Sequence, residues 1–362
     1  MDKRRGIDRS IASKHELEKA MRNLRQSLVV IAAVAGMATV AAAVTIDPPA
    51  TEDFDSAFKQ YNETLIETLV AEGTPHSMTL AATAITYGRQ GDESSVDRQR
   101  ALSARAAAMA PDDAWVQWIA AMNLPRSEVV SEPALALQRI EPDNGAAWLF
   151  QLAAASEAKD EAAITEALAR IGASRHFDEH FGDAMVEWLK VVRADPMPQL
   201  ATEGSKEASE QMQMIMAIGR AAAISLTDYT SPMRACKPTE QSLAADRRET
   251  CIATGRLMLK ESKTVMSMQT GAALLRLAGA EEAVEATRNA DYLMKKAIDL
   301  SRFAMLIPAE LARYQADWLQ TGSEVQAMKN QLTQAGIPLL PPKDWNEDPY
   351  GNLAKMSEQN NG

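Results

Sequence analysis

The chain has 362 residues and a formal net charge of −11 at pH 7, with 46% hydrophobic but only 5% aromatic residues. This acidic balance argues against a nucleic-acid-binding protein, because contacts to phosphates need clustered Lys and Arg side chains. The apolar residues are mainly Ala, with 19 Met, and both types favour helices, whereas the β-branched and aromatic residues that favour strands are scarce. The composition predicts an all-α protein, long enough for two ordinary domains or one extended repeat array.

The first 46 residues differ in charge from the rest. Residues 1–27 contain eight Lys or Arg against four acidic residues, and no charge follows until Asp47, so this part carries +4 and the remainder −15. Residues 28–46, LVVIAAVAGMATVAAAVTI, are uncharged and would span about 28 Å as a helix, close to the ~30 Å hydrocarbon core of a bilayer. We predict a cytoplasmic basic segment at 1–27 and a transmembrane helix at 28–46.

The charges on either side of the apolar segment predict its orientation. Basic residues precede it and acidic residues follow, so we expect a single-pass protein of the inner membrane, with a cytoplasmic N-terminus and a periplasmic body. The long basic region and long apolar core favour an uncleaved signal anchor. A cleaved signal peptide remains an alternative, because Ala41-Ala42-Ala43 has the small side chains that signal peptidase requires; residues 1–43 would then be removed.

Helical spacing of apolar residues begins near residue 55, interrupted by breakers such as Gly73-Thr74-Pro75. The short segments between breakers predict a succession of helical hairpins. Longer helical stretches are expected further on, at 203–226, 249–277, 280–306, 308–320 and 323–335. The predicted parts of the body are a helical-repeat domain at 50–200, a C-terminal helical region at 201–336, and a Pro-rich, disordered tail at 337–362.

Two similar motifs begin 31 residues apart. PDDAWVQWIAAM starts at Pro111, and PDNGAAWLFQLAAA starts at Pro142 and is followed by KDEAAITEALARI at 159–171. The Pro, Trp and Leu followed by an acidic, Ala-rich helix resemble the tetratricopeptide repeat, over roughly residues 94–195. The period is shorter than the usual 34, and Ala153 stands where Gly is usual. The resemblance implies stacked hairpins that bind other proteins.

Each residue of the second copy has an expected mechanical role. Pro142 should end the preceding helix, and Asp143 or Asn144 should cap the next one. Trp148 should fill the groove between paired helices, and the small side chains of Ala153 and Ala154 should let helices approach closely.

The run RHFDEHF at 175–181 contains the H-x-x-E-H spacing of inverted zinc peptidases. We predict a helix over 176–193 that begins the third repeat, with a core stripe of Phe177, Phe181, Ala184, Trp188 and Val191. The adjacent line of polar residues contains the weak metal candidates His176, His180, Asp183 and Glu187. We expect these residues to face water without sharing an ion, because no strand-rich peptidase scaffold surrounds the motif.

The two cysteines, Cys236 and Cys251, both follow the predicted transmembrane helix. An even pair in an oxidising compartment is typical of a disulfide, and closing this loop would stabilise the fold by about 3 kcal/mol. Unlinked buried thiols are the alternative interpretation. A redox-active pair would more often be C-x-x-C, and a zinc site would need more thiols.

No nucleotide-binding or hydrolase motif occurs, and His76 is isolated in the sequence, so we predict neither a catalytic residue nor a cofactor. We predict a membrane-anchored, extracytoplasmic scaffold for protein–protein interaction, with unknown protein partners and no nucleic acid. Trp115, Trp118 and Trp148 are possible partner-binding residues, although such residues usually belong to the core of a repeat. The alternatives are a metal-dependent hydrolase that uses 176–180 and a secreted, soluble helical protein.

Overall fold

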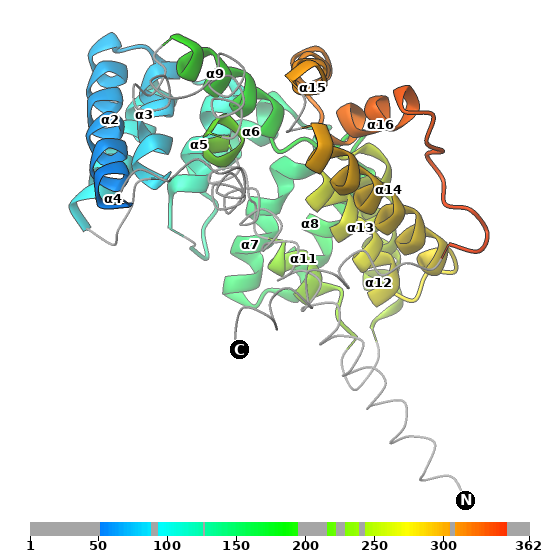
Figure 1. Ribbon diagram of the computed structural model, residues 1–362. Helices are drawn as coiled ribbons and strands as arrows, with labels where there is room; N and C mark the ends of the chain where they lie inside the picture. The colour runs from blue at the N-terminus through cyan, green and yellow to red at the C-terminus, as the bar shows by residue number, and fades with distance from the viewer. Residues whose placement is uncertain are drawn as a thin grey trace, which may run out of the picture. The chain divides into compact units, whose positions relative to one another are not determined.

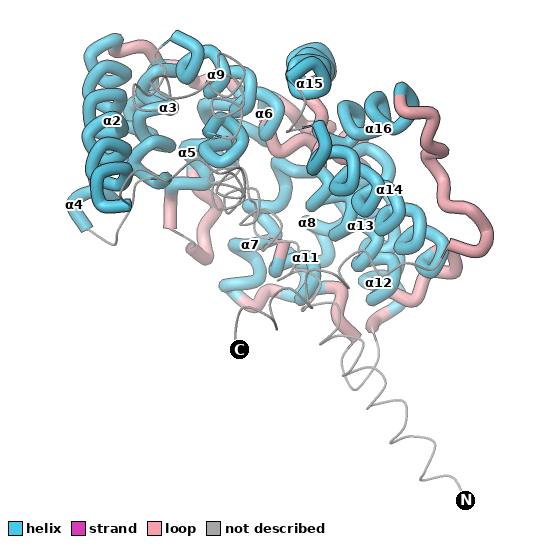
Figure 2. The backbone as a smooth tube through the Cα atoms, viewed as in Figure 1, coloured by secondary structure: helices cyan, strands magenta, loops and turns pink. Residues whose placement is uncertain are grey.

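Figure 1 shows the computed structural model of the protein. The residues that the structure describes are 51–87, 93–125, 127–194, 216–221, 229–238, 243–304 and 308–345. Every regular element in them is a helix, as Figure 2 shows, and β-structure is limited to isolated bridges. The prediction of an all-α fold is confirmed. None of the described helices is long and apolar enough to cross a membrane, and the predicted transmembrane helix at 28–46 lies outside the described residues.

The elements described below belong to one unit of the chain, residues 47–342. Its first region is the N-terminal array, in which each element contacts the next one along the chain (Figure 1). The array contains α2 (Thr51–Glu72), α3 (Pro75–Tyr87), α4 (Glu93–Met109), α5 (Ala114–Asn123), α6 (Glu132–Ile140), the 3₁₀ helix η2 (Gly145–Trp148), α7 (Leu149–Ala158) and α8 (Glu161–Ala173).

Polar caps explain where several of these elements begin. Asp113 caps α5, its Oδ1 accepting from Val116 N at 3.0 Å, and 31 residues later Asn144 caps η2 in the same way through Ala146 N at 3.1 Å. Such caps satisfy amide groups that have no partner within the helix. The expectation that Asp143 or Asn144 caps a helix is therefore confirmed for Asn144.

Trp148 differs from its expected role. Its side chain is only partly buried, and its Nε1 donates to Pro142 O at 3.3 Å. The guanidinium of Arg170 lies over the ring, 5.4 Å from its centroid. The indole is therefore a partly exposed side chain that contacts the turn at Pro142 and, through Arg170, helix α8.

In the C-terminal region, α9 to α16, contacts between neighbours along the chain are joined by contacts between helices that are distant in sequence. It contains α9 (Phe181–Ala194), α11 (Thr230–Ala235), α12 (Ala245–Glu261), α13 (Val265–Leu277), α14 (Ala283–Ala304), α15 (Pro308–Thr321) and α16 (Glu324–Gln334). Helix α12 packs on α8 and α13, whereas α9 packs on α15 and α11 packs on α7 and α13. Of the helix predicted at 203–226, the structure describes residues 216–221 within its limits, and they are helical.

The single helix predicted at 249–277 is wrong, because the chain breaks between Glu261 and Val265. Thr264 caps the start of α13, accepting from Ser267 N at 3.2 Å. Glu324 accepts from Val265 N at 2.8 Å and so satisfies a second amide of the new helix. The break depends on partners that are distant in sequence, so the apolar spacing could not indicate it.

Helices α12 and α13 approach closely at two glycines. A Cβ added to Gly271 would lie 2.5 Å from Leu259 N and 2.7 Å from Gly255 O. A Cβ on Gly255 would lie 3.0 Å from Gly271 O. Only hydrogen atoms fit at this crossing, so the two glycines set the distance between the helices.

The predicted disulfide is present and links Cys236, at the end of α11, to Cys251 in α12. Both residues are fully buried, and their Cα atoms are 5.7 Å apart. The bond holds the short helix α11, with Tyr229 at its start, against the longer helix α12.

Candidate functional site

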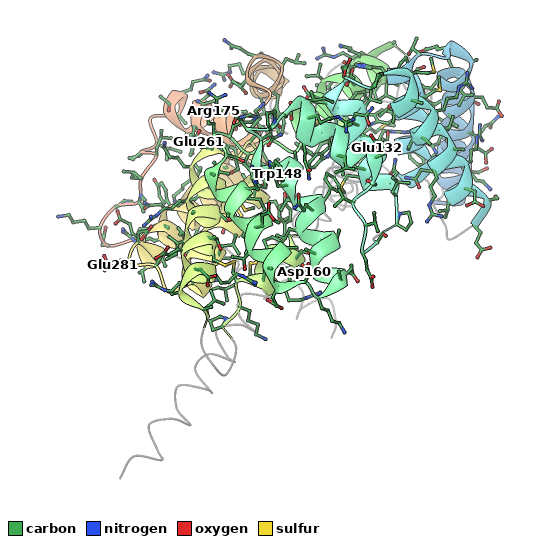
Figure 3. The ribbon with its side chains drawn as sticks, turned by 180° about the vertical axis from the view of Figure 1, so that it is seen from behind. Glu132, Trp148, Asp160, Arg175, Glu261 and Glu281 are labelled. Atoms are coloured by element: carbon green, nitrogen blue, oxygen red, sulfur yellow. A yellow bond between two sulfur atoms is a disulfide. The ribbon has the colours of Figure 1, made fainter. Side chains whose placement is uncertain are left out.

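The junction segment, residues 175–182, connects α8 to α9 and contacts both regions. His176 forms a parallel bridge with Asn144 of the N-terminal array, and Phe177 forms one with Ser262, just after α12. Figure 3 shows Arg175, at the start of the segment, close to the end of α12. The residues of the H-x-x-E-H motif therefore lie where two parts of the fold meet.

The helix predicted over 176–193 begins five residues later, at Phe181. His180 has a left-handed backbone with φ of +55°, which ends any helical run through the motif. Asp178 accepts a hydrogen bond from His180 N at 3.0 Å and so stabilises the turn before α9. The predicted line of polar residues along one helix is therefore wrong for His176 and His180.

The predicted core stripe of α9 is correct at some positions and shifted at others. Phe177, Ala184 and Trp188 are fully buried, but Phe181 is only partly so. The buried residue in the last turn is Val192, in place of Val191. Ala184, Trp188 and Val192 follow one another at four-residue spacing on the buried face of α9.

His180 is buried and ion-paired, whereas we expected it to face water. Its Nδ1 lies 2.8 Å from an Asp183 oxygen and its Nε2 lies 3.1 Å from a Glu141 oxygen. The ring of Trp118 is 5.7 Å from the imidazole. Burial opposes the charged form, but the hydrogen bonds to both carboxylates outweigh it and raise the pKa of His180 to about 10. His180 is therefore a structural imidazolium at neutral pH.

Glu141 is a partly buried counter-ion of this imidazolium. Burial would raise its pKa, yet the hydrogen bond and charge of His180 dominate and hold the pKa at about 2. Asn144 Nδ2 donates to Glu141 at 2.8 Å and to Asp178 O at 2.9 Å. The amide thereby ties the end of α6 to the junction segment.

Glu179 is fully buried in a pocket of hydroxyl groups from other segments. Tyr229 and Ser267 donate hydrogen bonds to its Oε1, and Thr264 Oγ1 lies 3.2 Å from the same oxygen. Burial, with a smaller contribution from the charge of Asp178, raises the pKa of Glu179 to about 8. At neutral pH this side chain is mainly a carboxylic acid.

Asp178, the residue before Glu179, forms an ion pair with Lys263, in the connection between α12 and α13. Burial of Lys263 disfavours its charge, but Asp178 outweighs this and raises the pKa of the lysine. Three consecutive residues of the junction segment thus contact three different parts of the fold.

The four weak metal candidates do not come together. Asp183 lies beside His180. Glu187 is elsewhere, with one carboxylate oxygen 2.6 Å from Lys190 Nζ and the other 3.9 Å from His76 Nδ1. Among the residues that the structure describes, no group of three or more His, Cys, Asp or Glu has an arrangement that could hold a metal ion. Both ring nitrogens of His180 already contact carboxylates, which leaves no lone pair directed at an ion.

His76 is not isolated in the structure. Its Nε2 lies 2.8 Å from an Asp113 oxygen, and its ring contacts Trp115 edge-on, with centroids 4.9 Å apart. Asp113 is also the cap of α5, so this contact joins the starts of α3 and α5.

Two of the three possible partner-binding tryptophans lie in the core. Trp115 is 4% exposed and Trp118 is fully buried, so neither can contact a partner in this conformation. Trp148 alone among them presents part of its ring to solvent.

The junction contacts have no sequence signature. Glu141, Tyr229, Lys263 and Ser267 are far from 178–180 in sequence and belong to no motif with it. What the arrangement does chemically is to hold one carboxylic acid and one imidazolium away from water, with partly exposed counter-ions beside the imidazolium.

Comparisons with known proteins add no family to this description. No family model, no curated protein and no solved structure matches the chain.

Proposed function

We propose that this protein is a membrane-anchored, extracytoplasmic helical-repeat protein that acts as a scaffold for protein–protein interaction. The observation that carries the proposal is the consecutive packing from α2 to α8, in which each element contacts its neighbour along the chain. Helical hairpins stacked in this way build extended surfaces that bind segments of other proteins.

Two features support the proposed location. The uncharged run at 28–46 has basic residues before it and acidic residues after it, the charge pattern of a single-pass anchor with its body outside. The Cys236–Cys251 disulfide is of a kind that persists in oxidising compartments and is rare in the cytosol.

The hydrolase alternative has no observation in its favour. Glu179 and His180 of the motif are buried among hydroxyls and counter-ions, and the described residues contain no metal cluster. The secreted alternative differs from the proposal only in the fate of residues 1–43.

Membrane fractionation tests the location. We expect the full chain to stay with the membrane after carbonate extraction, and protease added to spheroplasts to digest the body but not a tag at the N-terminus. A soluble mature protein that begins near Val44 would instead establish the secreted alternative.

Site-specific photo-crosslinking in native membranes tests the scaffold role. A photoreactive residue at Trp148, on the N-terminal array, should give an adduct of discrete mass that unlabelled protein competes away. Lys260, which is 81% exposed on α12, is the matched control and should give no such adduct. No saturable adduct at Trp148 or at other exposed array positions would contradict the scaffold proposal.

A further inference from the structure

The carboxyl group of Glu179 is the point at which three separate segments meet. Its partners are Tyr229 at the start of α11, Thr264 at the cap of α13, and Ser267 in the first turn of α13. Tyr229 OH and Thr264 Oγ1 each also lie 2.9 Å from Ser267 Oγ. We call these four residues, Glu179, Tyr229, Thr264 and Ser267, the Glu179 contact. Each of them is less than a tenth exposed.

No cation among the described side chains pairs with Glu179. The nearest lysine, Lys263, forms its ion pair with Asp178, and the imidazolium of His180 lies between Glu141 and Asp183. An ionised Glu179 would therefore be a buried carboxylate that has only hydroxyl groups as partners and a second carboxylate as its sequence neighbour. Such a charge is costly because it loses hydration without gaining a counter-ion.

The charged and titratable groups around the contact come from every element that packs there. On the junction segment they are Asp178 and His180, and α9 adds Asp183. The end of α6 adds Glu141, and the α12–α13 connection adds Lys263. Helix α16 adds Glu324, which accepts from Val265 N beside the cap of α13. The pKa of Glu324 is itself raised by burial to about 6, so its contribution has to be separated by experiment.

We propose that the Glu179 contact is a proton-dependent switch: the protonated carboxyl fastens α11 and the start of α13 to the junction segment, and its ionisation releases them. The proton leaves to solvent, and the resulting carboxylate gains hydration when the hydroxyl groups of Tyr229, Thr264 and Ser267 move away. The device is distinct from the proposed scaffold role and does not depend on it.

The direction of the pH effect follows from linkage. Burial raises the pKa of Glu179 from 4.5 to about 8, so the protonated form is favoured in the closed structure. The stabilisation is fully present below pH 4.5 and is lost progressively as the pH rises through 8. Raising the pH from 6 to 9 should therefore increase opening of the contact about 10-fold or more.

Amide hydrogen exchange of the full chain, in lipid nanodiscs at pH 6 to 9, tests the switch. After correction for intrinsic exchange rates, protection in peptides that cover 229–236 and 262–268 should fall about 10-fold or more across this range in the wild type. The variant Glu179→Gln keeps the shape but cannot ionise, so it should show no such fall. Glu166→Gln, an exposed change on α8, should behave as the wild type.

Each result decides for or against the switch. Constant protection in the wild type overturns it, as does an unchanged pH response in Glu179→Gln. Loss of the response in Glu324→Gln instead would assign the effect to Glu324 and also overturn it. If Glu179→Gln does not fold, a wild-type midpoint near pH 8 that persists in Glu324→Gln still supports the switch.

Discussion

The N-terminal array and the C-terminal region are both helical, but the C-terminal region adds contacts between helices that are distant in sequence. In the array, α2 to α8 contact their neighbours along the chain, and short polar caps separate them. In the C-terminal region, α12 to α16 also contact their neighbours along the chain, but α9 contacts α15 as well, and α12 contacts α8 across more than 70 residues. A disulfide, two closely packed glycines and the buried polar groups of the junction segment hold this second region.

Contacts between sequence neighbours and contacts between segments far apart in sequence use different chemistry in this chain. Neighbouring hairpins need only an apolar face and a cap, because chain connectivity keeps them together. Distant segments lose more chain entropy when they associate, so they need contacts that fix position, such as the disulfide and the Glu179 contact. Four changes to the chain, with losses of stability from about 5 down to about 1 kcal/mol, test this difference.

Truncating the fully buried Trp118 should be the most damaging change in the array. Trp118→Ala should lower the free energy of unfolding by about 3–5 kcal/mol, because it leaves a large cavity beside Phe150 and His180. Urea unfolding of the full chain in mild detergent measures this loss.

The matched control is Trp148→Ala at the partly exposed edge, where about 1–2 kcal/mol is expected. Equal losses for the two variants would mean that Trp148 belongs to the core and would remove it as a partner-binding residue.

Removing the disulfide should affect the C-terminal region most. The double change Cys236→Ser with Cys251→Ser should cost about 3 kcal/mol, because the unfolded chain regains the entropy of an open 15-residue loop. In hydrogen exchange, the backbone amides of α11 and α12 should lose protection before those of α3 and α4. Uniform loss of protection would show that the two regions unfold as one unit.

The glycine crossing of α12 and α13 should tolerate no methyl group. Gly271→Ala should destabilise by about 1–3 kcal/mol in thermal or urea unfolding, since the added Cβ would meet backbone atoms that cannot rotate away. Gly279→Ala is a useful comparison, because a Cβ there has open space and only the positive φ of +64° opposes it. A stabilised Gly271→Ala variant would show that the crossing has room and that helix propensity dominates.

The smallest effect is expected at a cap of the array. Asp160 Oδ1 accepts from Ala162 N and Ala163 N at the start of α8, so Asp160→Ala should cost about 1 kcal/mol. Asp160→Asn retains a capping oxygen and should be close to neutral in the same unfolding measurement. A full loss with Asn would indicate that charge, and not the cap, is what α8 requires.

Much of the array could be predicted from the sequence because its signals are local. The Pro142 turn and the cap at Asn144 followed from residue type and spacing, and so did the helix after Asp160. The junction segment could not be predicted, because its conformation depends on distant side chains. Nothing near 175–181 indicates that Lys263 pairs with Asp178, or that Tyr229 and Ser267 cover Glu179. H-x-x-E-H thus drew attention to an important segment, but for the wrong chemical reason.

The unusual protonation states of Glu179 and His180 change the charge of the folded molecule. The formal value of −11 counts Glu179 as ionised and His180 as neutral, yet at pH 7 the fold makes the first mainly neutral and the second charged, which gives a net charge close to −9. Folding at neutral pH therefore takes up protons from the buffer, about 1.7 per chain from this pair of residues. Calorimetric unfolding should accordingly give an apparent enthalpy that changes with the ionisation enthalpy of the buffer.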